Sequence, residues 1–262
     1  MSIVAKVNFS NYQDSISKVL DIIEAKNSLP QKGLIIIKPN LTNASLPPVT
    51  TNVQAIEAIY IYCKKYSSAQ IVIGEGCGSG MTSDVLKTTG YDRLAKKHGT
   101  KLFDFNSEEA VKVKRDDTFN LKEFYIPKIL LEAYIISVPV LKDHSFTKTT
   151  IAMKNMFGIA PAPYYQGGWN KSKLHSPSTD QSVVDVCLYK RPDLSIVDAN
   201  IALTGSHLWG IPKAIGKILA SYDPVAIDAV GSELLGHDKN SIKYLKLANN
   251  ILGSMDNIEI IK

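Results

Sequence analysis

The 262-residue chain is long enough to bury a full hydrophobic core, and its 45% hydrophobic and 21% charged residues exclude a disordered protein. Its formal net charge of +5 is spread over several lysine-rich segments. This spread argues against nucleic-acid binding, because nucleic-acid-binding surfaces concentrate their positive charge. The three cysteines lie far apart, so the chain contains neither a disulfide framework nor a motif that could hold an iron–sulfur cluster.

No segment has the pattern of a signal peptide, and no apolar run approaches the length of a membrane span. Unpaired cysteines also suit a reducing compartment. The sequence therefore predicts a cytoplasmic protein without membrane or nucleic-acid partners.

Short apolar runs alternate with helical patterns along the chain. In the first half, strands are expected at 34–37, 71–73 and 101–104, and helices at 53–66 and 83–97, the latter interrupted by Gly90. In the second half, strands are expected at 124–126, 134–138, 194–197 and 215–220, and helices at 180–188, 224–235 and 241–250. This order predicts an α/β fold in which a mainly parallel sheet is covered by helices on both faces.

Residues 160–178 differ from the rest of the chain, because they are rich in proline, glycine and aromatic residues and lack periodicity. Loops of this length inside a compact domain are usually functional. No repeat or linker divides the chain, so we expect a single α/β domain over residues 1–262. Within it, residues 160–178 are predicted to form an ordered lid or insertion, with His175 or Trp169 facing a cleft.

Most of the expected strands are followed by a charged or amide residue. These residues are Lys38 with Asn40, Glu75, Asp104, Lys142 with His144, Asp198, and Asp223. One such residue is an ordinary turn or helix cap, but ligands bind at the carboxyl ends of parallel strands, where all six positions would meet. The sequence therefore predicts an active-site cleft at that edge of the sheet.

Lys142 and His144 are two residues apart, which in extended backbone directs both side chains to the same side. Such a pair can transfer a proton or hold a carboxylate, and the alternative is a turn with exposed charges. Lys38 follows an apolar run, and a buried amine there would need an anion. Glu75, His144 and Asp198 are also candidate ligands for a divalent metal ion.

The glycine-rich segment 74–80 is a second candidate for ligand contact. It looks like a phosphate-binding loop, but Ser79 replaces the third glycine of the dinucleotide motif and no Lys-Ser/Thr pair follows. We interpret it as a flexible loop in which the backbone can approach a ligand closely.

A series of short motifs then spans nearly the whole chain. They are IIIKPN at 35–40, TTN at 50–52, IGEG at 73–76, TGY at 89–91, VPVLKDH at 138–144, AMKNMFG at 152–158, His175, VDA at 197–199 and SYDPVAIDA at 221–229. In this order they resemble the family named domain of unknown function 362. The resemblance implies redox metabolism, because many relatives carry a ferredoxin-like segment, and a redox role here would require a separate redox partner.

The resemblance also implies functional roles for Lys142, His144, Lys154 and Asn155, which lie in two of its clearest motifs. Lys154 would otherwise be an ordinary residue at the end of a helix. The chain departs from the family at 202–210, where relatives have a turn rich in glycine and His207 brings an additional imidazole.

The resulting prediction is an enzyme that acts on a small carboxylate or phosphate metabolite by lysine and histidine acid–base chemistry, either alone or with a divalent metal. Proton transfer next to a carbonyl, as in an isomerase or lyase, suits these residues and needs no organic cofactor. The alternative is a metal- or iron–sulfur-associated binding protein that serves a redox partner. Catalytic candidates are His144, Lys142, Glu75 and Asp198, and ligand-binding candidates are Lys38, Asn40, Lys154, Asn155, His175 and His207.

Overall fold

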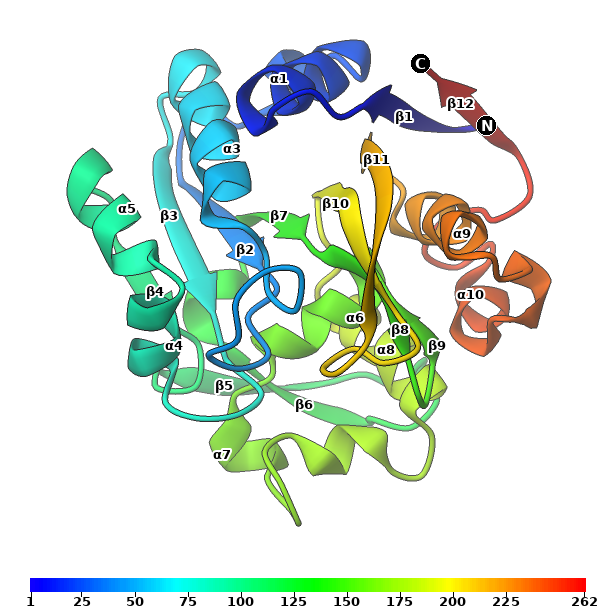
Figure 1. The fold of residues 1–262 in the computed structure, drawn as a ribbon. Helices are drawn as coiled ribbons and strands as arrows, with labels where there is room; N and C mark the ends of the chain where they lie inside the picture. Colours follow the sequence, from blue (N-terminus) through cyan, green and yellow to red (C-terminus); the bar gives the residue numbers. More distant parts are fainter.

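A mixed sheet of ten strands forms the centre of the computed structural model, which describes all residues from 1 to 262 (Figure 1). Its parallel part consists of β10 (Leu194–Thr204), β7 (Tyr134–Val138), β2 (Leu34–Pro39), β3 (Gln70–Glu75) and β4 (Leu102–Asp104), in that order. The apolar, β-branched runs of β2, β3 and β7 are buried, as is typical of parallel strands covered on both faces. The α/β fold predicted from the sequence is confirmed.

The opposite edge of the sheet is partly antiparallel. β11 (Ile211–Ser221) runs antiparallel to both β10 and β1 (Ser2–Asn8), and β12 (Ile258–Ile261) pairs in parallel with β1. Because β11 is reversed, Asp223 does not lie at the carboxyl ends of the parallel strands. Its carboxylate instead caps α9 (Pro224–Leu235), accepting hydrogen bonds from the amides of Val225 and Ala226 at 2.8 and 2.9 Å.

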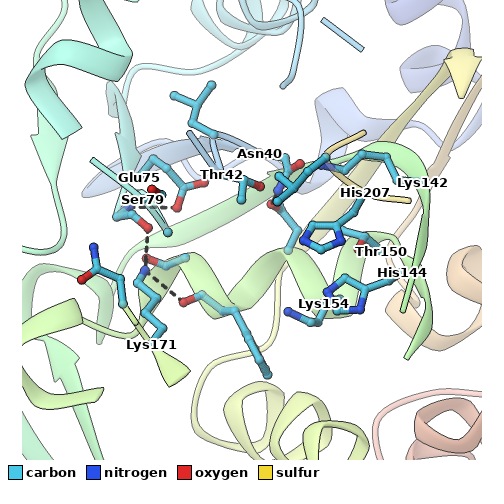
Figure 2. A pocket seen from close by; sticks show the side chains of 18 of the residues that line it. Asn40, Thr42, Glu75, Ser79, Lys142, His144, Thr150, Lys154, Lys171 and His207 are labelled. Carbon is cyan, nitrogen blue, oxygen red and sulfur yellow. Dashed lines mark hydrogen bonds between the residues drawn. The ribbon is translucent and has the colours of Figure 1, made fainter. Parts of the chain in front are cut away.

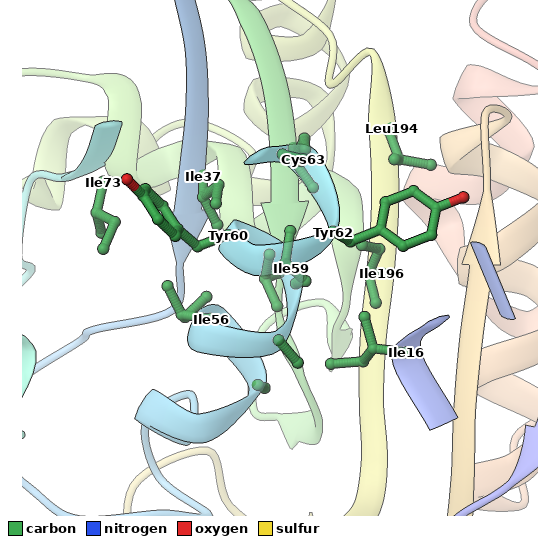
Figure 3. Close-up of a cluster of buried hydrophobic side chains, with 14 of the residues drawn as sticks. Ile16, Ile37, Ile56, Ile59, Tyr60, Tyr62, Cys63, Ile73, Leu194 and Ile196 are labelled. Carbon is green, nitrogen blue, oxygen red and sulfur yellow. The ribbon is translucent and has the colours of Figure 1, made fainter. Parts of the chain in front are cut away.

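Helices cover both faces of the sheet. One face carries α1 (Tyr12–Ile22), α2 (Ala25–Ser28), α3 (Val53–Tyr66), α4 (Thr82–Thr88) and α5 (Tyr91–His98), and the other carries α6 (Ala152–Asn155), α8 (Thr179–Tyr189), α9 and α10 (Lys243–Ala248). Side chains of β2 alternate between them, since Ile37 packs in the first core and Ile36 in the second. Figure 3 shows the first core, with Ile59 of α3 between Ile37 and Ile196.

The remaining elements are short. They are β5 (Ala110–Lys114), β6 (Glu123–Pro127), β8 (Val140–His144), β9 (Lys148–Thr150), α7 (Ala162–Tyr165), and the 3₁₀ turns Lys128–Leu130, Met156–Ile159, Ser172–His175 and Lys239–Ser241. The strand expected at 124–126 pairs with β5 in a separate two-stranded sheet. The helix expected at 83–97 is divided into α4 and α5 at Gly90, whose φ of 86° favours glycine. None of the helices is both long and apolar enough to cross a membrane.

The short hairpin of β8 and β9 carries part of the candidate site. β7 pairs with the start of β10, and after Pro139 the chain continues as β8 beside the outer half of β10. Within the hairpin, Lys142 lies opposite Thr150 and His144 opposite Lys148. Because β8 is extended, Lys142 and His144 share one side of the strand, as their spacing predicted.

Candidate functional site

A cavity of about 600 Å³ lies beside the carboxyl ends of β2, β3 and β8 (Figure 2). Its wall is built from segments far apart in the sequence: residues 40–42, 75–79, 142–150, 154–158, 169–175 and 207–208. The predicted site residues that line it are Asn40, Glu75, Lys142, His144, Lys154, Asn155, His175 and His207. Lys38 and Asp198 do not line it.

Lys38 lies behind the cavity wall, where its side chain is fully buried. Its ammonium donates to Glu75 Oε2 at 2.7 Å, to the Pro39 carbonyl at 3.1 Å and to Asn155 Oδ1 at 3.3 Å. These acceptors use all three donors of the ammonium, so Lys38 orients Glu75 and Asn155 and has no donor left for a ligand. Burial lowers the pKa of Lys38, and the charge of Glu75 opposes this shift.

Gly158 permits the close packing around this ion pair. A Cβ atom at this position would collide with the Glu75 carboxylate and the Lys38 ammonium. The last residue of the AMKNMFG motif must therefore be glycine, because any side chain there would displace the Lys38–Glu75 ion pair.

Asp198 belongs to the opposite face of the sheet. It lies two residues after Ile196, which packs in the core under α1 and α3, so both side chains are on that face. The Asp198 carboxylate accepts a hydrogen bond from the Tyr12 hydroxyl at 2.9 Å, and burial raises its pKa. The expected grouping of Asp198 with Glu75 and His144 is therefore wrong, and no group of three or more His, Cys, Asp or Glu residues is arranged to hold a metal ion.

Two lysines face the cavity without a carboxylate partner. The Lys142 ammonium donates to the Val49 carbonyl at 2.8 Å, and Lys154 Nζ lies 3.7 Å from the centre of the Phe157 ring without a hydrogen bond to the protein. Desolvation lowers the pKa of Lys142 to about 7. It also lowers the pKa of Lys154 to about 7, and the charges of Lys142, Lys171 and Lys38 contribute to that shift. The pKa values of both amines therefore lie close to physiological pH, so each amine is partly neutral in the free protein.

Three imidazoles lie close together in the cavity wall, and Figure 2 shows two of them, His144 and His207. The His144 ring stacks on His207 with a centroid distance of 4.2 Å, and it is nearly parallel to His175 at 6.3 Å. Desolvation and the neighbouring lysines lower the pKa of His175 and His207 to about 4, and the same causes lower that of His144. The three rings are therefore neutral near pH 7, and His144 Nδ1 accepts a hydrogen bond from the amide of Phe146 at 3.1 Å.

Residues 160–178, which we call the lid segment, contribute Trp169, Asn170, Lys171 and His175 to the cavity wall. Sequence reasoning missed Lys171. Its ammonium donates to the carbonyl of Gly76 at 2.5 Å and to those of Phe157 and Gly158, each at 3.3 Å. Lys171 thus ties the lid segment to the glycine-rich loop, and no spacing in the sequence could have indicated these backbone partners.

Asp228 supports the site from outside the cavity. Its buried carboxylate accepts hydrogen bonds from the amides of Ala152 and Met153 at 2.7 and 3.2 Å, and from the Tyr244 hydroxyl at 3.0 Å. These bonds satisfy the first amides of α6, whose last turn carries Lys154. Burial raises the pKa of Asp228 to about 7.

One known protein is similar to this chain in sequence. Over 212 residues the chain is 24% identical to thylakoid-associated protein sll1697 of Synechocystis sp., a match that covers 79% of this chain and 64% of the relative. The chain thus spans less than two thirds of that relative's length. Because the relative is named for an association with thylakoids, this finding contradicts the cytoplasmic location predicted from the sequence, and that prediction is wrong.

The family assignment rests on a longer match. Residues 35–233 match the model of the family described as domain of unknown function (DUF362), and this range includes every cavity-lining segment. It also includes the motifs that resembled the family in the sequence. Since the match covers more than half of its length, the chain belongs to the DUF362 family.

Proposed function

We propose that the protein binds a small carboxylate or phosphate metabolite in this cavity and transforms it by acid–base chemistry of lysine and histidine. The observation that supports this proposal is the presence of Lys142 and Lys154 in the wall without an acidic partner. A buried ammonium without a counter-charge is costly, and an anionic ligand would remove that cost. The bound anion would therefore provide the negative charge that Lys142 and Lys154 lack in the free protein.

The neighbouring groups suit proton transfer next to a carbonyl, as in an isomerase or lyase. His144 has a lowered pKa, and its neutral ring carries the proton on Nε2 because Nδ1 accepts from the Phe146 amide. The ring can therefore donate a proton to the substrate while the lysines stabilise the negative charge that develops there. Glu75, held by Lys38, is the carboxylate of the wall and is a candidate for the second proton-transfer group.

The binding step is tested by titration calorimetry with inorganic phosphate, pyruvate and citrate. We expect Lys142→Met and Lys154→Met to weaken binding at least tenfold, because each removes a charge-assisted contact. Lys128→Met is the matched control, since the side chain of Lys128 is 62% exposed and lies outside the cavity wall. Equal losses in all three variants, or no binding of any of these anions to the wild type, would refute the proposal.

The alternative of a metal- or cluster-associated protein with a redox partner has no specific observation in its favour in this cavity. It is checked by the colour and iron content of the purified protein. A brown preparation with stoichiometric iron would favour this alternative over the acid–base enzyme.

We further propose that the mouth of the cavity lies against a membrane surface. Phe146 and Trp169 line the cavity and are 58% and 57% exposed, and Trp209 and Ile211 follow the lining residue Leu208 and are 82% and 75% exposed. Exposed lysines flank these side chains at positions 148, 173 and 213. Aromatic and aliphatic side chains beside lysines are typical of proteins that bind at an anionic membrane interface, and the name of the thylakoid-associated relative agrees with such a surface.

A further inference from the structure

We propose that Lys154 forms an imine with the carbonyl carbon of a small oxo acid, so that the metabolite of the cavity is a carboxylate that also carries an aldehyde or ketone. This inference rests on the proposed function, because it places the carboxylate beside Lys142. It adds a covalent step and a substrate class to that function.

An imine-forming lysine must present an amine with a free lone pair to the cavity. Two of the lysines around the cavity instead use their ammonium protons in hydrogen bonds to the protein. Lys38 donates to three acceptors, including Glu75 at 2.7 Å, and Lys171 donates to three backbone carbonyls. An amine that uses all three protons in this way is held as an ammonium and is not a nucleophile.

Lys142 and Lys154 remain, and their surroundings differ. Lys142 is fixed by its bond to the Val49 carbonyl, an acceptor that favours the protonated form. Lys154 has no hydrogen-bond acceptor in the protein, and its Nζ lies over the face of the Phe157 ring. Lys154 is only 8% exposed and lies in the cavity wall, so its amine is accessible from the cavity, where a ligand would bind (Figure 2). The lowered pKa of Lys154, about 7, agrees with a large neutral fraction at physiological pH.

The backbone also holds Lys154 in place. The short helix α6 would be unstable alone, but the Asp228 carboxylate accepts hydrogen bonds from its first amides, Ala152 and Met153. Because Asp228 is fully buried and bonded to Tyr244, this anchor is fixed. The amine is therefore positioned by the core of the protein and not by a mobile loop.

The chemistry balances with groups in the cavity and solvent. The neutral Lys154 nitrogen attacks the carbonyl carbon, and one of its protons moves to the former carbonyl oxygen, to which His144 Nε2–H donates a hydrogen bond. A further proton, taken from solvent that enters the cavity, leaves with the hydroxyl group as water, and this loss gives a protonated imine. This cation withdraws electrons from the adjacent carbon, so the Glu75 carboxylate in the cavity wall can remove a proton there and leave an enamine. Reprotonation and hydrolysis return the amine and a carbonyl product, which is the proton transfer that the proposed function requires.

The test uses pyruvate, glyoxylate and 2-oxoglutarate as probes, each with sodium cyanoborohydride, and reads the intact mass of the wild-type protein. We expect a single adduct with the mass of the oxo acid minus one oxygen atom, mapped to Lys154 by peptide mass spectrometry. Lys154→Arg keeps the positive charge but cannot form an imine, so it should lose the adduct and retain anion binding. Lys128→Arg is the matched control, since Lys128 is exposed outside the cavity wall, and it should retain the adduct.

The wild-type mapping does not depend on how well the variants fold. An adduct on Lys142 or only on surface lysines, or no adduct with any of the three probes, would overturn the imine. If phosphate and pyruvate still bind in that case, the proposed function survives without the covalent step. If neither binds, the proposed function fails as well.

Discussion

The rings of His144 and His207 stack at a centroid distance of 4.2 Å and an interplanar angle of 23°. His144 ends β8, and His207 follows β10, so the pairing of these two strands brings the rings together. The stack buries His144 among cationic neighbours and keeps it neutral. This relationship makes His144 the first residue to test for proton transfer.

We expect His144→Gln to keep the fold and to lower turnover by about two to four powers of ten, the usual contribution of a positioned acid or base. Because the pKa of His144 is lowered, the limb of the wild-type pH profile that depends on His144 should lie below about 6.5, the ordinary histidine value. His98→Gln is the control, since His98 pairs with Glu57 away from the cavity. Full turnover with an unchanged pH profile in His144→Gln would remove this residue from the mechanism.

Anion binding should be linked to proton uptake. Lys142 and Lys154 have pKa values of about 7 in the free protein, and a bound anion raises both by favouring the ammonium form. Affinity is therefore expected to be highest below pH 7 and to fall as the pH rises above it. Calorimetry of phosphate binding in buffers of different ionisation enthalpy measures the uptake. A zero uptake at pH 8 would contradict the lowered pKa values.

The same shifts predict how the stability of the free protein depends on pH. The two lysines titrate near pH 7 when folded but near their ordinary value when unfolded, so between these values the unfolded chain binds more protons. The free energy of unfolding should then rise between pH 7 and pH 8.5, by up to about 1.4 kcal/mol per pH unit for each lysine. Urea unfolding checks this slope. The Lys142→Met, Lys154→Met double variant should show a smaller one.

Lys171→Met should loosen the lid segment without unfolding the core, because it removes the donor that joins Lys171 to the Gly76, Phe157 and Gly158 carbonyls. We expect faster amide hydrogen exchange in residues 160–178 and weaker anion binding, with unchanged exchange in β2 and β7. Lys173→Met is the control, since Lys173 is an exposed neighbour in the same segment. Equal exchange in both variants would show that this link does not hold the lid segment.

Membrane attachment is tested by sedimentation with vesicles that contain anionic lipids. Trp209→Ser with Ile211→Ser should reduce binding at least tenfold, because both apolar side chains are exposed in the segment that follows the lining residue Leu208. Ile251→Ser is the control, as Ile251 is 55% exposed in the turn between α10 and β12. Wild-type protein that does not sediment with the vesicles at low salt would refute the proposed surface.

The sequence by itself determined the local elements and much of the candidate site. Apolar runs predicted β2, β3 and β7, and the spacing of Lys142 and His144 predicted their common side, because both signals depend only on the repeat of the backbone. The composition of 160–178 likewise predicted an ordered segment with His175 or Trp169 facing the cleft, and both residues line the cavity.

Only the tertiary structure decided which polar residues meet. The antiparallel pairing of β11 moved Asp223 to the other end of the sheet, and the alternation along β10 turned Asp198 toward Tyr12. The ammonium groups of Lys38 and Lys171 are buried and each donates to three acceptors of the protein, so these two residues have a structural role. The amine of Lys154 has no such acceptors and is available to a ligand. These outcomes depend on strand order and on backbone carbonyls contributed by distant segments, and the periodicity of a single segment carries no information about either.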